Sequence, residues 1–306
     1  MRLKIAARQV LACIRDDEVV DVDSRASRTA LGAARHRAVH QLLEHGAVVR
    51  DPLAVPILGE PEAELRAADT DRRMRLFVCA RQRYAEDLIA DAVGRGVEQL
   101  VVLGAGLDTF GYRNPWTGLR VVELDHPATQ AWKRERLAAA SIEVPPSVTH
   151  APIDFERDDL GAVLVRYVDP TRPVLFWWLG VTPYLTLEAV TATLTVLGSL
   201  PHAAVVLDHR APDPEATHEA LAVMRERVQR VAALGEPWIT ELAPDDLVRL
   251  LVSCGFEQTH LEDEVALIRR VLRRPTAGES PGRRVTHLAL ATTGWPNGRA
   301  AQAARS

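Results

Sequence analysis

Cysteine and long apolar runs are scarce in this chain of 306 residues, and their scarcity excludes several classes of protein. The 3 cysteines, Cys13, Cys79 and Cys254, form no C-x-x-C pair and no Cys/His cluster with zinc spacing, so neither a disulfide framework nor a metal site is expected. No window of about 18 apolar residues predicts a membrane span. The first 20 residues lack the continuous apolar core of a signal peptide. We therefore expect a cytoplasmic protein, since unpaired cysteines suit a reducing compartment.

A basic excess is also lacking, because the formal net charge is −4 at pH 7 and the sequence pI is about 6.2. This balance favours neither nucleic acid nor an anionic membrane surface as a partner. A hydrophobic content of 47% is enough for a sizeable core. Nothing in the pattern indicates the number of subunits.

The chain divides into a helical N-terminal part and a part in which strands and helices alternate. Periodic runs at 29–45 and 71–94 predict helices of an N-terminal cap that spans residues 1–95. From 96 to 293, short apolar runs alternate with helical stretches, which predicts an α/β domain with a doubly wound, mostly parallel seven-stranded sheet. The expected strands are 99–104, 119–125, 148–155, 173–180, 203–209 and a closing hairpin-like pair at 256–261 and 287–293. An insert around 210–245, with a helix at 215–234, and a disordered tail at 294–306 complete the prediction.

The segment LGAGLDTFGYR (103–113) opens a glycine turn directly after the first predicted strand. A dinucleotide-binding turn has the pattern G-x-G-x-x-G/A, but its third small position is Thr109 here. The alternative cofactor is S-adenosylmethionine, whose sulfonium is cationic and whose adenosyl group needs small residues at the turn. Acids near the site suit that cofactor.

Two such acids, Asp125 and Asp154, end the second and third predicted strands. A carboxylate at the first position can accept from the ribose hydroxyls, and one at the second from the adenine amino group. Strand-end acids also often cap the next helix, and Pro127 is a typical helix start, so capping remains an alternative for Asp125.

Several segments make the chain resemble the leucine carboxyl methyltransferase-like family of class I S-adenosylmethionine-dependent methyltransferases. The resemblance is strongest to bacterial small-molecule O-methyltransferases, and it runs from about residue 24 to residue 260. The pattern GAGLDT followed by E-x-D-x-P is its most specific part. The segments are SRASRTA (24–30), DPLA (51–54), ARQRYAED (80–87), LVVLGAGLDTFGYR (100–113), VVELDHPATQAWKRERL (121–137), IDF (153–155) and LGVTPYLTLEAV (179–190).

The resemblance implies a set of cofactor-binding residues. An arginine before the glycine turn binds the cofactor carboxylate, which a guanidinium can grip in bidentate fashion, and this position corresponds to Arg81. The remaining positions are Gly104, Ala105 and Gly106 in the turn, Asp125 at the ribose, and Asp154 and Phe155 at the adenine. His126 follows Asp125 directly, so we expect it on the adenosine side as well.

Two positions depart from the family pattern. Relatives often have arginine where this chain has Phe110, and they usually have glutamate near the cofactor amino group, where this chain has Leu179. We therefore expect a more apolar site, in which Leu179 faces the cofactor and backbone carbonyls such as that of Gly104 hold its ammonium group.

Methyl transfer from a sulfonium is an in-line displacement, so the protein mainly aligns the reactants and excludes water. A carboxylate acceptor needs no general base, whereas a hydroxyl acceptor gains from one. The predicted catalytic residues are His209, at the end of the fifth strand, and Tyr184, after the fourth. His36 and His40 share a helix face that is expected to be solvated. Aromatic walls are expected from Trp177, Trp178, Tyr184, Tyr112 and Trp238.

The leading hypothesis is an S-adenosylmethionine-dependent O-methyltransferase that acts on a carboxylate or hydroxyl of a small molecule, such as a polyketide-like metabolite. A cofactor-binding protein without methyl transfer and an NAD-dependent oxidoreductase remain alternatives. The substitution at Leu179 keeps the first alternative open, and Thr109 disfavours the second.

Overall fold

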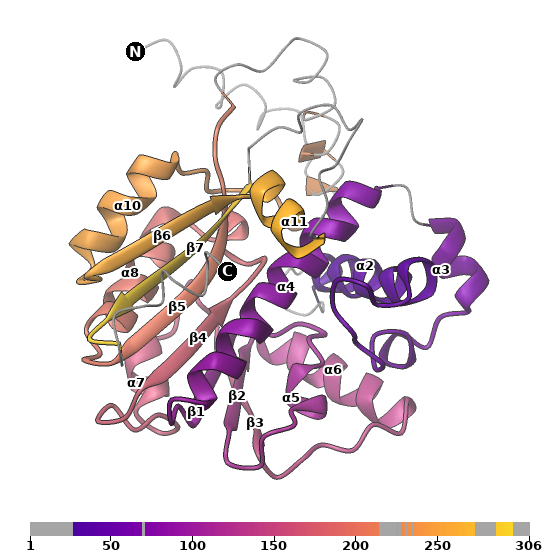
Figure 1. Cartoon of the computed structure of the whole chain (residues 1–306), viewed down its shortest axis with the longest axis horizontal. Helices are drawn as coiled ribbons and strands as arrows, with labels where there is room; N and C mark the ends of the chain where they lie inside the picture. The colour runs from indigo at the N-terminus through magenta and orange to yellow at the C-terminus, as the bar shows by residue number, and fades with distance from the viewer. Residues whose placement is uncertain are drawn as a thin grey trace, which may run out of the picture.

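The computed structural model describes residues 27–68, 71–213, 225, 228, 229, 232, 233, 235–272 and 286–295. Its seven-stranded sheet has the order β3-β2-β1-β4-β5-β7-β6 (Figure 1). The first five strands are parallel, and β7 lies antiparallel between β5 and β6. The strands are β1 (Gln99–Leu103), β2 (Arg120–Asp125), β3 (Val148–Pro152), β4 (Val174–Trp178), β5 (Ala203–Arg210), β6 (Gln258–Asp263) and β7 (Thr286–Thr293). The predicted fold class is confirmed, including the closing antiparallel pair.

Every residue of β1 and β4 is buried, as expected of central parallel strands that are covered on both faces. From β1 the chain runs outward to β2 and β3, and it then returns to β4 on the other side of β1. The carboxyl ends of β1 and β4 are therefore the point at which the strand order reverses. Ligands of open α/β sheets bind at this point.

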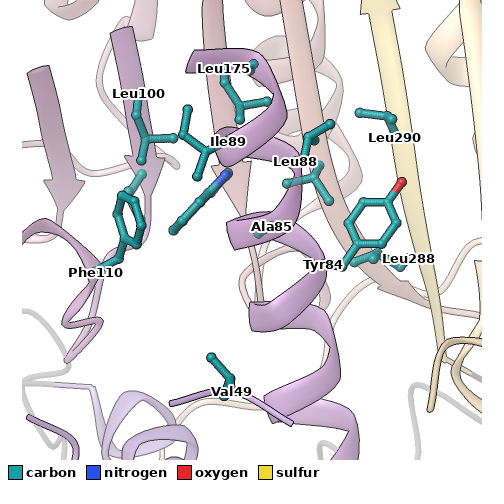
Figure 2. Packing of buried hydrophobic residues seen from close by; sticks show 14 of the residues in the cluster. Val49, Tyr84, Ala85, Leu88, Ile89, Leu100, Phe110, Leu175, Leu288 and Leu290 are labelled. Carbon is teal, nitrogen blue, oxygen red and sulfur yellow. The ribbon is translucent and has the colours of Figure 1, made fainter. Parts of the chain in front are cut away.

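Helices cover both faces of the sheet. The helices α4 (Arg72–Val93) and α11 (Glu264–Leu272) pack on one face, and α7 (Leu160–Leu164), α8 (Leu187–Gly198) and α10 (Pro244–Ser253) pack on the other. In Figure 1, α4 crosses in front of the strands. Figure 2 shows how Ala85, Leu88 and Ile89 of α4 reach the core around Leu100 and Leu175.

A smaller core joins the N-terminal helices to the rest of the molecule. It includes Leu107 of the glycine turn together with residues of α2 (Arg28–Glu44), 3-10 helix η3 (Pro56–Leu58), α3 (Glu62–Ala68) and α6 (Pro127–Ala139). Two polar contacts hold the N-terminal segments against the glycine turn. Arg37 Nη2 donates to the Leu107 carbonyl at 2.6 Å, and Thr109 Oγ1 donates to the buried Asp51 carboxylate at 2.7 Å. Thr109, which breaks the dinucleotide pattern, thus ties the turn to the DPLA segment.

The remaining elements are α5 (Phe110–Arg113) and 3-10 helix η4 (Thr182–Tyr184). The predicted helix at 215–234 lies almost entirely outside the described residues, as do residues 1–26 and the tail beyond 295. The division at residue 95 stays a prediction, although α4 itself packs on the sheet. Among the described helices, none is long and apolar enough to cross a membrane.

Candidate functional site

A cavity of about 660 Å³ opens at the carboxyl ends of the central strands, where the sequence places the site. Residues of α2, α4, the glycine turn and the loops after β2, β3 and β4 line it. Apart from His209, every predicted site residue lies in this lining: Arg81, Gly104, Ala105, Gly106, Asp125, His126, Asp154, Phe155, Leu179 and Tyr184. The strand-end rule therefore brings together residues that are far apart in the sequence.

The glycine turn leaves no room for side chains at its two glycines. Both have positive φ angles, +68° at Gly104 and +47° at Gly106. A Cβ at Gly104 would lie 2.4 Å from Val181 Cγ2, and one at Gly106 would lie 2.8 Å from the Cβ of Ala30 in α2. Only glycine relieves both the backbone strain and the contact. The turn thus exposes its backbone to the cavity.

Asp125 links the glycine turn to the end of β2. Its Oδ2 accepts the Gly106 N–H at 2.5 Å, and its Oδ1 accepts the His126 N–H at 2.7 Å. The N-cap of α6 is His126, whose Nδ1 accepts from Ala128 N at 3.3 Å, so the carboxylate of Asp125 does not cap this helix. The side chain instead faces the cavity, where it can accept further hydrogen bonds.

Burial raises the pKa of Asp125 to about 6, even though the backbone hydrogen bonds from Gly106 and His126 lower it. If the carboxylate accepts from cofactor hydroxyls, the affinity for S-adenosylhomocysteine should fall as the pH drops below 6. At one pH unit below this pKa, about a tenth of the carboxyls remain ionised, so the dissociation constant should rise about tenfold. Calorimetric titrations between pH 8 and pH 5 measure this change. In Asp125→Asn the affinity should be lower and independent of pH over this range; a pH dependence like that of the wild type would assign the proton to another group.

The loop after β3 supplies another part of the cavity lining. Phe155 packs against Trp178 with a ring-centroid distance of 6.5 Å. Asp154 Oδ1 accepts the Glu156 N–H at 3.0 Å, and its side chain keeps 24% exposure in the cavity lining. The N-cap of α7 is Asp159, so Asp154 does not cap that helix either.

Arg81 reaches the cavity from α4 and pairs with an acid that the sequence analysis did not select. Its Nη1 donates to Asp208 Oδ2 at 2.7 Å, and the guanidinium carbon lies 5.6 Å from the Phe77 ring centroid. Asp208 is 3% exposed and stands at the end of β5, directly before His209.

His209 is not brought to the cavity. Successive residues of a strand point to opposite faces, and Asp208 takes the face toward α4. His209 is 2% exposed and stacks on His287 at a centroid distance of 5.3 Å. Burial, and then the charge of His287, lower its pKa to about 4. This placement corrects the expectation that His209 faces the cofactor edge.

Three further expectations need correction. His40 is fully buried rather than solvated: its Nδ1 lies 3.2 Å from Glu44 Oε2, and its Nε2 accepts the Val48 N–H at 3.0 Å. Phe110 is a core residue, 4.6 Å from Trp177 between centroids, and does not line the cavity. Of the expected aromatic walls, Trp177, Tyr184 and Trp238 line the cavity, whereas Trp178 and Tyr112 do not.

The segment around Trp238 lies over the cavity and is fixed at both sides. The N–H groups of Ile239 and Thr240 donate to the Pro183 carbonyl at 2.6 and 3.2 Å. Glu236 accepts the N–H groups of Arg28 and Thr29 at 3.0 and 2.9 Å, at the start of α2. Sequence reasoning placed Trp238 near the site but missed Glu236, because its partners are more than two hundred residues away.

The sheet order, the glycine turn at the switch point and the acid at the end of β2 together define a class I methyltransferase. Comparison with known proteins narrows the class. The family model for leucine carboxyl methyltransferases matches residues 30–198, more than half of the chain, so the chain belongs to this family.

Two relatives agree with this membership, and a solved structure shares the fold. A protein of Frankia alni named as an S-adenosyl-L-methionine-dependent methyltransferase is 31% identical over 268 residues, covering 81% of this chain and 89% of that protein. A Mycobacterium sp. (strain KMS) protein of the same name is 30% identical over 241 residues, with coverage of 71% and 76%. The structure of a methyltransferase from Thermobifida fusca matches with a TM-score of 0.55 at 17% identity, covering 89% of this chain and 96% of that one. The chain is an S-adenosylmethionine-dependent methyltransferase, and the dinucleotide interpretation of its glycine turn is set aside.

Proposed function

We propose that the enzyme transfers the methyl group to an oxygen of a small molecule, with a carboxylate as the preferred acceptor. The observation that carries this proposal is an apolar and aromatic part of the cavity lining. It consists of Leu179 and the aromatic side chains of Trp177, Tyr184 and Trp238. Such walls suit a planar or apolar acceptor, for example an aromatic or polyketide-like acid.

The residues of the cavity fit the cofactor in their chemistry. A Cβ at Gly104 or Gly106 would collide with Val181 or Ala30, so the turn presents bare backbone to the cavity, and Asp125 presents a carboxylate acceptor beside it. We propose that Asp125 binds the ribose hydroxyls, that His126, Asp154 and Phe155 border the adenosine, and that Arg81 binds the carboxylate. When bound, S-adenosylmethionine supplies an electrophilic methyl group on a sulfonium.

The protonation states in the cavity favour an acceptor that is already ionised. Burial raises the pKa of Tyr184, so its phenol is neutral at pH 7 and donates a hydrogen bond instead of abstracting a proton. The predicted base, His209, does not line the cavity. A carboxylate needs no base, and Tyr184 can hold it in line with the methyl group. A hydroxyl acceptor is the second candidate, because His36 of α2 also lines the cavity and could serve as its base.

A panel of matched aromatic acids, phenols and amines tests the acceptor, with release of S-adenosylhomocysteine and mass spectrometry of the products as readouts. We expect methyl esters from the acids. Loss of the donor in Tyr184→Phe should lower kcat/KM for an acid by about tenfold to hundredfold, which corresponds to one hydrogen bond to a charged acceptor. The His36→Gln variant should keep activity on acids. Methylation of phenols alone, abolished in His36→Gln, would replace the carboxylate proposal with the hydroxyl one; methylation of amines alone would overturn both.

A further inference from the structure

One buried carboxylate holds two walls of the cavity together. Asp208 Oδ2 accepts from Arg81 Nη1 of α4 at 2.7 Å, and Oδ1 accepts the N–H of Gly180, in the loop after β4, at 2.5 Å. The backbone carbonyl of Asp208 also accepts from Thr182 Oγ1 at 2.7 Å, so a second hydrogen bond joins the end of β5 to the segment that follows β4. Asp208 does not line the cavity, whereas Arg81 and Gly180 do.

Gly180 gives the guanidinium a flat surface on which to lie. Its φ is +76°, and a Cβ built on it would lie 2.6 Å from Arg81 Nη2 and 3.1 Å from Nη1. The absence of a side chain therefore lets the guanidinium approach the backbone closely. Phe77 contacts the same guanidinium at 5.6 Å between the guanidinium carbon and the ring centroid, so three groups restrict its orientation. The side chain of Arg81 is only 12% exposed.

We propose that Asp208 is a positioning residue for the cofactor, which it serves by holding the Arg81 guanidinium in the orientation that binds the carboxylate of the cofactor's amino-acid end. A guanidinium has five N–H donors in a rigid fork, so the bond from Nη1 to Asp208 leaves other donors for a second carboxylate. The fork loses less entropy on binding if its rotamer is already fixed. The residue before Gly180 is Leu179, which carries no carboxylate. The acid that pairs with Arg81 is therefore Asp208 of the neighbouring strand β5.

Two roles for Asp208 predict opposite signs. If only the charge of Asp208 mattered, removing it would make the local net charge around Arg81 more positive and would strengthen the binding of an anion. If its position matters, removing the charge frees the guanidinium and weakens binding of the amino-acid end. This contrast separates positioning from a general electrostatic effect.

The experiment compares two ligands in the Asp208→Asn variant by calorimetry. S-adenosylhomocysteine has the amino-acid end, whereas 5′-deoxy-5′-methylthioadenosine keeps the nucleoside and the thioether but lacks that end. We expect the dissociation constant of S-adenosylhomocysteine to rise roughly tenfold to hundredfold, as for loss of a hydrogen bond to a charged group, and that of methylthioadenosine to stay within about twofold. Tighter or unchanged binding of S-adenosylhomocysteine, or an equal loss for both ligands, would overturn the proposal. Asp245→Asn, an exposed change in the first turn of α10, is the matched control and should leave both constants unchanged.

The proposal rests on the proposed contact of Arg81 with the cofactor carboxylate, and Arg81→Met tests that contact separately. We expect this variant to lose affinity for S-adenosylhomocysteine alone, and we expect Asp208→Asn to add less than about twofold on the Arg81→Met background, because the two residues act as one unit. Unchanged binding in Arg81→Met would refute the arginine contact itself. A loss in Arg81→Met without one in Asp208→Asn would refute only the role of Asp208. If Asp208→Asn does not fold, Asp208→Glu keeps the ion pair but displaces the guanidinium by a methylene, and the same contrast between the ligands is expected.

Discussion

Replacing Asp125 by alanine is expected to weaken binding of S-adenosylhomocysteine by a factor of about a hundred or more while the protein stays folded. The proposed contacts are two hydrogen bonds from ribose hydroxyls to a charged acceptor, each worth about 1.5–3 kcal/mol, and every 1.4 kcal/mol corresponds to about a factor of ten. The alanine variant also leaves the N–H groups of Gly106 and His126 without their acceptor, which loosens the glycine turn. The fold should survive because burial makes the ionised carboxylate costly in the cofactor-free protein, as its raised pKa shows.

The same two ligands test whether Asp125 contacts the nucleoside part of the cofactor. Both S-adenosylhomocysteine and methylthioadenosine contain the ribose, so Asp125→Ala should weaken the two by similar factors, whereas Asp208→Asn should affect only the first. Circular dichroism and thermal unfolding without ligand check that the variant is folded, and Asp245→Ala in α10 serves as the exposed control. Normal affinity in a folded Asp125→Ala protein would contradict the assignment of the ribose site.

Local pattern explains which parts of the fold could be predicted from the sequence. The apolar run before the glycine turn became β1, and the acids at 125 and 154 came to one cavity because parallel strands end at the same edge. Short apolar runs and helical periodicity need only neighbouring residues, so they are visible in the sequence alone. The long helical run at 71–94 was predicted for the same reason, and it became α4.

The errors have a different origin, since they depend on which face of an element a residue occupies. Asp208 and His209 both stand at a strand end, but α4 supplies Arg81 to the face of Asp208, and only the packing of that helix decides between them. Thr109 looked like a defect in a nucleotide motif, whereas its hydroxyl donates to Asp51 of the DPLA segment. Glu236 accepts the N–H groups of Arg28 and Thr29 in the first turn of α2, although it lies more than two hundred residues away in the sequence. Pairs so distant in sequence leave no local pattern that identifies them.

The largest effect on stability is expected from breaking a buried ion pair between α6 and β2. Lys133 of α6 and Glu123 of β2 are 2% and 1% exposed, and Lys133 Nζ lies 2.6 Å from Glu123 Oε2. The carboxylate also accepts from the Tyr112 hydroxyl at 2.9 Å, and His150 Nε2 lies 3.4 Å away. Burial alone raises the pKa of Glu123, but Lys133 and His150 together bring it below its usual value. The ion pair therefore joins β2, β3, α5 and α6 through a charge that has no access to water.

Lys133→Met should lower the free energy of unfolding by about 3–5 kcal/mol, because it leaves a buried carboxylate without its counter-charge. Urea unfolding at pH 7 measures the loss, and Arg134→Met, the exposed neighbour on the same helix, should change the value by less than about 0.5 kcal/mol. Without Lys133, the pKa of Glu123 rises above its value in the unfolded chain. The carboxyl then binds a proton in the folded state first, so the deficit should shrink as the pH is lowered toward the unfolded value. The double variant Glu123→Gln/Lys133→Met removes the charge and should recover a large part of the loss. A single variant as stable as Arg134→Met, or a double variant less stable than Lys133→Met, would show that the pair contributes little and that the packing of α6 against β2 holds this part of the fold in place.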